Sequence, residues 1–133
     1  FMDFERFSGK KILLAEADAV TSYIKTDGKA LYNVDFILDW KPFERPDLAQ
    51  YMREHDILAG VIHPDTMHEE MILKSHSEGA KLLILYSLAV DLERNQMFHR
   101  LLDRGISVVN RPYIFPPKVL LEAVGNMLDW TKN

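Results

Sequence analysis

The chain of 133 residues contains no cysteine, and this absence excludes several classes of protein. Disulfide scaffolds, cysteine-ligated zinc sites, iron–sulfur clusters and thiol catalysis all need a residue that the sequence lacks. Its 47% hydrophobic and 27% charged residues are instead the balance of a soluble globular domain. The composition therefore predicts one domain that builds its core without a metal or a disulfide.

Long apolar runs and blocks of basic charge are also missing. The longest apolar runs, residues 12–15 and 82–86, are far shorter than the ~20 residues of a membrane span, and residues 1–6 do not resemble a signal peptide. The net charge of −4 comes from 16 basic and 20 acidic residues scattered along the chain. We therefore expect neither membrane insertion nor direct binding of nucleic acid.

What the sequence does have, after a leader at residues 1–9, is an alternation of apolar runs with helix-like stretches. The runs predict five strands, at residues 11–15, 34–38, 57–62, 82–86 and 107–110. The stretches between and after them predict five helices, at residues 19–31, 47–55, 65–78, 92–104 and 116–128. Residues 10–133 are thus predicted to form an α/β domain, a doubly wound five-stranded parallel sheet in the flavodoxin-like order 2-1-3-4-5, with helices on both faces.

A site in such a sheet is expected at the carboxyl ends of the strands, where the strand order reverses. The residues predicted to lie at that edge are Glu16, Ala17, Asp18, His63, Asp65, Ser87 and Arg111. The imidazole and carboxylate groups within residues 63–69 suit zinc or nickel, but the two histidines straddle a proline turn and no third converging ligand is evident. We therefore predict no metal site there and interpret these groups as solvated residues at a helix start.

Two segments resemble response-regulator receiver domains. Residues 10–18, Lys-Lys-Ile-Leu-Leu-Ala-Glu-Ala-Asp, are similar to the family's opening strand, which ends in a pair or trio of acids. Residues 105–113 are similar to its closing strand, which ends in Lys-Pro-Phe before the last helix. The resemblance spans residues 10–130, and residues 7–10 are similar to linkers that precede receivers in hybrid sensor kinases. It implies a cytoplasmic signal-transduction domain of a two-component phosphorelay.

In that family two acids hold Mg²⁺, an aspartate after the third strand accepts a phosphoryl group, and a hydroxyl residue and a lysine contact the phosphate. Glu16 matches the first acid, but Ala17 stands where the second is expected, and Asp18 is predicted to cap the first helix. Either Val61 or His63 stands at the acceptor position. Neither side chain is a carboxylate, so the phosphorylation chemistry is predicted to be lost.

The remaining positions agree only in part with the family. Asp65 follows a proline and is predicted to begin the third helix, Ser87 matches the hydroxyl residue, and Arg111 replaces the lysine. The chain is therefore predicted to be a degenerate receiver, a pseudo-receiver that is not an enzyme and holds no cofactor, with Mg²⁺ expected only if the Glu16 site is functional. Two alternatives stay open: a phosphoacceptor that uses Asp65, and a sensor of an anionic small molecule such as a cyclic dinucleotide.

The resemblance also implies partners, namely a histidine kinase or an output domain of the same pathway, with a homodimer as a further option. The implied contact surface is the fourth helix, the fifth strand and the fifth helix. On it, Tyr113 is the aromatic residue nearest the closing motif, and Leu121 with Gly125 and Trp130 is predicted to extend apolar surface beyond the core stripe of the last helix. The alternative is that Leu121 is one of the scattered exposed leucines of any soluble domain.

Overall fold

A computed structural model describes residues 3–15, 21–42, 44–63, 68–86, 92–110 and 116–131. The chain forms a five-stranded parallel sheet in the order β2-β1-β3-β4-β5, which confirms the predicted flavodoxin-like α/β fold. The strands are β1 (Lys11–Ala15), β2 (Asp35–Ile37), β3 (Ile57–Ile62), β4 (Leu82–Tyr86) and β5 (Ser107–Asn110). The helices are the short 3₁₀ helix η1 (Phe4–Phe7), α1 (Thr21–Tyr32), α2 (Leu48–Glu54), α3 (Glu69–Ser77), α4 (Leu92–Asp103) and α5 (Pro117–Thr131).

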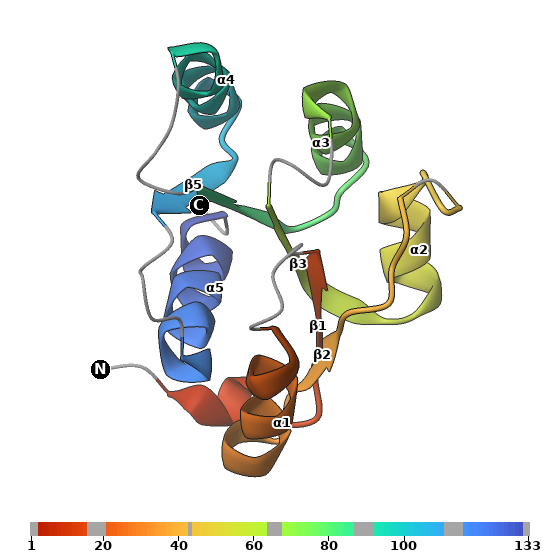
Figure 1. Cartoon of the computed structure of the whole chain (residues 1–133), viewed down its shortest axis with the longest axis vertical. Coiled ribbons are helices and arrows are strands. Elements are labelled where there is room, and N and C mark those ends of the chain that lie inside the picture. The colour runs from red at the N-terminus through yellow and green to blue at the C-terminus, as the bar shows by residue number, and fades with distance from the viewer. Residues whose placement is uncertain are drawn as a thin grey trace.

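The sheet separates two apolar cores, because successive side chains of a strand point to opposite faces. In β1, Leu13 contributes to the core beneath α2, α3 and α4, whereas Ile12 and Leu14 contribute to the core beneath α1 and α5. Figure 1 shows the same division, with α1 and α5 on one side of the sheet and α2, α3 and α4 on the opposite side. Both faces of β1 are buried, which explains its continuous apolar run.

Most of the predicted elements are confirmed, four of the strands with the same bounds. The exception in position is α3, which was expected to start at residue 65 or 66 and starts at Glu69. His68 has φ −71° and ψ 151°, an extended conformation that the first turn of a helix cannot include. At its other end α3 stops as predicted: Gly79 has φ 98°, and the N–H of Ala80 donates to the carbonyl of Ser75.

Gly28 lies inside α1. A Cβ atom at this position would stand 2.5 Å from Cε2 of Phe36, a fully buried residue of β2. Glycine costs a helix about 1 kcal/mol relative to alanine. Here that cost is offset by the close packing of α1 on β2. Any larger side chain at this position would push the helix and the strand apart.

Residues 3–9 are part of the folded domain, which corrects the expectation of a separate leader at residues 1–9. Phe7 has no exposed surface and belongs to the core beneath α1 and α5. The Arg6 guanidinium contacts both carboxylate oxygens of Asp129 on α5, at 3.0 and 3.1 Å. Together these contacts fasten η1 to the domain.

Within the described ranges, none of the helices combines the length and the apolar composition that crossing a bilayer requires.

Candidate functional site

The strand order reverses at β1, which pairs with β2 on one side and β3 on the other. The carboxyl ends of β1 and β3 are aligned, because Ala15 is opposite Ile62. The next residue, His63, continues the ladder, since its backbone N–H donates to the carbonyl of Ala15 at 2.9 Å. His63 therefore stands at the point where a ligand site is expected in a doubly wound sheet.

The structure shows where the two residues that the resemblance left open, Val61 and His63, lie relative to the core. Val61 is fully buried in the core beneath α1 and α5, and Ile62 is fully buried in the opposite core. His63, the residue that follows β3, is half-buried. Its imidazole supplies nitrogen rather than the oxygen ligands that Mg²⁺ prefers.

The other residues predicted for this edge, and one predicted for the contact surface, lie outside the described part of the chain. They are Glu16, Ala17, Asp18, Asp65, Ser87, Arg111 and Tyr113.

Of the groups within residues 63–69 that suit zinc or nickel, Glu69 is engaged elsewhere. Arg100 of α4 donates to both carboxylate oxygens, Nε to Oε2 at 2.8 Å and Nη2 to Oε1 at 2.7 Å. These hydrogen bonds lower the pKa of the Glu69 carboxyl and raise the pKa of the Arg100 guanidinium. In the ranges that the structure describes, no group of three or more histidine, aspartate or glutamate side chains is placed to hold a metal ion.

The predicted exposure of Leu121 is wrong. Leu121 has no exposed surface, and Gly125 one turn later is also buried, so neither extends an apolar surface. The buried stripe of α5 includes Leu121 together with Leu120, Val124 and Met127, whereas Val119 is 38% exposed. Trp130 is exposed as predicted, at 56%.

A groove of about 570 Å³ lies between α5 and the strands β4 and β5. Val119 and Trp130 line it from α5, with Glu122 of the same helix, and Val109 lines it from β5. β5 is an edge strand, since β4 is its one partner in the described sheet. Val119 and Trp130 are thus exposed apolar side chains on the predicted contact surface, to which α4 adds Leu92 and Leu102 outside the groove.

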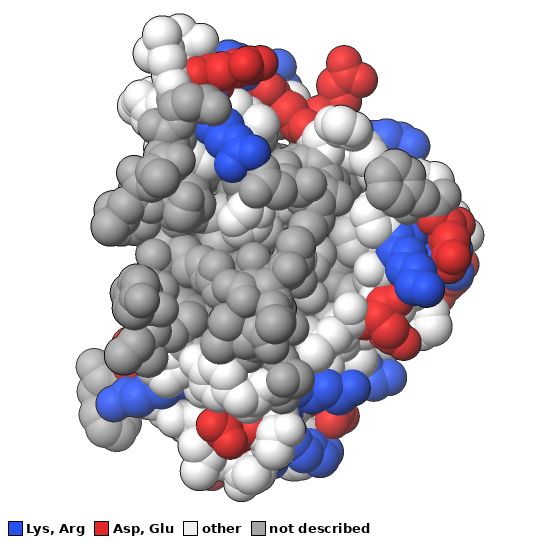
Figure 2. Space-filling model, in the orientation of Figure 1, with Lys and Arg blue, Asp and Glu red and all other residues white. Residues whose placement is uncertain are grey.

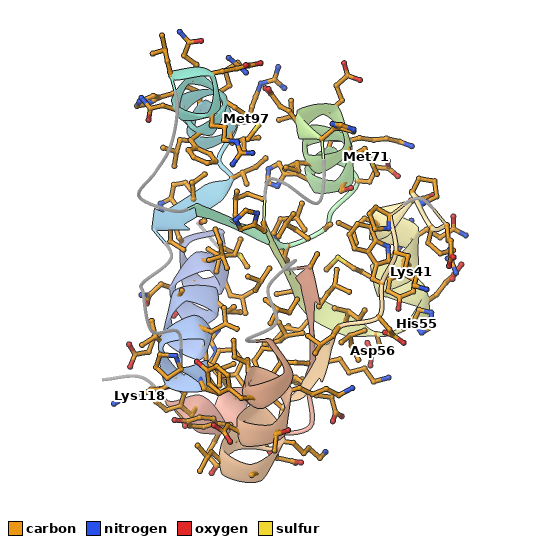
Figure 3. The ribbon with its side chains drawn as sticks, in the orientation of Figure 1. Lys41, His55, Asp56, Met71, Met97 and Lys118 are labelled. Carbon is orange, nitrogen blue, oxygen red and sulfur yellow. The ribbon has the colours of Figure 1, made fainter. Side chains whose placement is uncertain are left out.

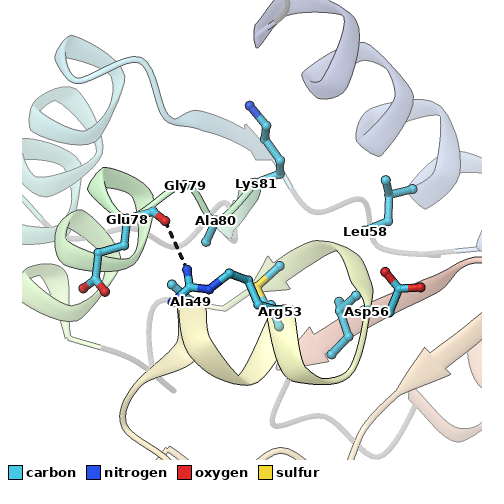
Figure 4. A pocket seen from close by; sticks show the side chains of 10 residues that line it. Ala49, Arg53, Asp56, Leu58, Glu78, Gly79, Ala80 and Lys81 are labelled. Atoms are coloured by element: carbon cyan, nitrogen blue, oxygen red, sulfur yellow. Dashed lines mark hydrogen bonds between the residues drawn. The ribbon is translucent and has the colours of Figure 1, made fainter.

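A second pocket, of about 500 Å³, lies at the amino ends of β3 and β4, away from the predicted site. Its charged lining residues are Arg53, Asp56, Glu78 and Lys81, and Figure 4 shows Arg53 reaching across it. Arg53 Nη1 donates to the carbonyl of Glu78 at 3.3 Å. No motif in the sequence pointed to this pocket, because its charged residues come from separate loops and helix ends.

Figure 2 shows where the described charged side chains lie on one face of the molecule. Basic and acidic side chains alternate around its rim, and among the described residues drawn there no extended basic patch is visible. This distribution agrees with the scattered charges of the sequence.

Comparison with known proteins defines the fold and no more. No family model matches the chain, and no curated protein matches it. Among solved structures, the chain is similar to the crystal structure of an adenylate cyclase from Rhodopirellula baltica, with a TM-score of 0.62 and 15% sequence identity. The match covers 91% of this chain and 88% of that one, so the two share one α/β architecture over nearly their whole lengths.

Proposed function

We propose that the chain is a receiver-like regulatory domain of two-component signalling that is not phosphorylated and acts through protein contacts. The observation that carries the proposal is the end of β3 at the switch point of a 2-1-3-4-5 sheet. There Val61 is buried and His63 follows the strand, and on this proposal His63 stands where receivers have their acceptor aspartate. The resemblance of residues 10–18 and 105–113 to receiver motifs supports the same interpretation.

On this proposal the domain works in the cytoplasm, has no catalytic activity of its own and needs no cofactor. Glu16 is the one well-placed acid in the opening motif, and one carboxylate is a poor match for Mg²⁺, which keeps its waters unless several oxygens replace them. Its partners are a histidine kinase or an output domain of the same pathway, with a second copy of the chain as the further option. The name of the structural neighbour, an adenylate cyclase, describes that protein; at 15% identity it does not argue for cyclase activity here.

Incubation with acetyl phosphate and Mg²⁺ is expected to leave the intact mass of the protein unchanged. Phosphoryl transfer needs a nucleophile and a bound metal ion that neutralises charge. On this proposal the chain lacks the aspartate that serves receivers as the nucleophile and one of the two acids that hold their Mg²⁺. A receiver with the complete set of acids, treated in parallel, is the positive control. A gain of one phosphoryl group that maps to Asp65 would establish the phosphoacceptor alternative, and one that maps to His63 would indicate a phosphohistidine carrier.

The surface of α4, β5 and α5 is the proposed working surface, and its groove offers Trp130 as an anchor. Replacing Trp130 with alanine is expected to weaken self-association by at least about tenfold, because a tryptophan that inserts into a partner commonly dominates binding energy. Sedimentation equilibrium over a range of protein concentrations measures the effect, and thermal unfolding checks that the fold is kept.

Leu31→Ala is the matched control, since Leu31 is 67% exposed but lies on α1. If both substitutions weakened self-association equally, the surface of α4, β5 and α5 would not be the contact surface. A wild-type protein that stays monomeric at every concentration would rule out the homodimer and leave the kinase or output domain as the partner.

A further inference from the structure

α4 is anchored to the domain by few buried side chains. Of its 12 residues only Phe98 and Leu101 are buried, three positions apart on one face of the helix. Met97 is partly buried against the same core from α4, and Met71 is partly buried against it from α3 (Figure 3). Methionine side chains adapt to small displacements, so they constrain a helix weakly. Two neighbouring anchors define the orientation of a helix less firmly than anchors spread along its length would.

The pair of Glu69 and Arg100 supplies a third point of attachment. Arg100 lies on α4 between the two anchors in sequence, and Glu69 is the first residue of α3. Both hydrogen bonds are shorter than 2.9 Å and use both carboxylate oxygens, so the contact fixes an orientation as well as a distance. Glu69 also lies at the amino end of its helix, where the helix dipole favours a carboxylate.

We propose that the Glu69–Arg100 pair is a latch that fixes the position of α4 from the first turn of α3. Glu69 begins the helix that follows β3 in the chain, and the proposal includes a coupling between the latch and the carboxyl end of β3. The coupling needs no phosphate, and its role in signalling rests on the function proposed above. The latch itself is a property of α3 and α4 that can be tested whether or not that function is correct.

Hydrogen exchange at the backbone amides of α4 tests the latch. Exchange over residues 92–103 is expected to become about threefold to fivefold faster in Glu69→Gln and in Arg100→Gln. This acceleration corresponds to losing the stabilisation that an exposed ion pair of good geometry provides. The double variant is expected to exchange no faster than either single variant, because each change removes the same interaction. Unchanged exchange in both single variants, or a double variant whose effect is the product of the two, would overturn the latch.

Lys74→Gln is the matched control, because it removes an ion pair between α3 and the residue that follows it, Glu78, at 3.8 Å, and leaves α4 untouched. It is expected to leave exchange over α4 as in the wild type. Equal acceleration in this control would mean that any lost charge on α3 loosens α4, which would also overturn the proposal.

The coupling to β3 has its own measurement. The proton resonances of the His63 imidazole are expected to shift in Arg100→Gln and to stay in place in Lys74→Gln. If α4 loosens while the His63 resonances do not move, the pair holds the helix but transmits nothing to the strand end, and the coupling is refuted. The phosphorylation assay bears on neither result, so failure of the latch and failure of the proposed function are distinguishable.

Discussion

Replacing Leu121 with glutamate is expected to unfold the protein rather than to alter its association. Leu121 has no exposed surface and packs with Leu120, Val124 and Met127 of α5 in the core beneath α1 and α5. Burying an unpaired carboxylate there costs several kcal/mol, and the whole stability of a domain is typically about 5–15 kcal/mol. The milder Leu121→Ala is expected to cost about 2–5 kcal/mol. Circular dichroism and urea unfolding measure both.

Val119→Glu is the control for position, because Val119 is two residues away on the same helix and 38% exposed. It is expected to keep the fold, since a carboxylate there can reach water. A Leu121→Glu protein that unfolds at the wild-type urea concentration would show that α5 does not pack on the sheet in this orientation.

Replacing Phe7 with alanine is expected to lower the free energy of unfolding by about 3–5 kcal/mol, the usual cost of removing a buried aromatic ring. Phe7 has no exposed surface even though it precedes the first strand. Urea unfolding is the measurement, and Glu5→Ala, at an exposed position of the same 3₁₀ helix, is expected to change stability by no more than about 0.5 kcal/mol. If the two variants were equally stable, residues 3–9 would be a dispensable leader after all.

These two residues show where reasoning from the sequence stopped. A helical stripe can be drawn through α5 with either Val119 or Leu121 on its edge, because neighbouring apolar residues satisfy the helical period almost equally well. The packing of α5 on the sheet selects Leu121. In the same way, nothing local distinguishes Phe7 from an exposed aromatic residue of a linker, and its burial depends on helices that are distant in sequence.

The candidate site was predicted in part. The apolar run of residues 57–62 placed the end of β3 correctly, because a strand buried on both faces is marked by its own composition. The placement of Val61 in a core and of His63 beside Ala15 needed the sheet, since the hydrogen bond from the His63 N–H to Ala15 and the two cores depend on neighbouring elements. The pairing of Glu69 with Arg100 joins residues 31 positions apart and has no local signal.

The sequence by itself determined the alternation of strands and helices, the doubly wound class of the sheet and the absence of cysteine chemistry. These features follow from local periodicity and from composition, which each segment carries without reference to the others. Only the tertiary structure decided which face of α5 is covered, that residues 3–9 belong to the core, and which residue of α3 holds α4. Those outcomes depend on contacts between elements far apart in the chain, where several arrangements satisfy the same local pattern and packing selects one of them.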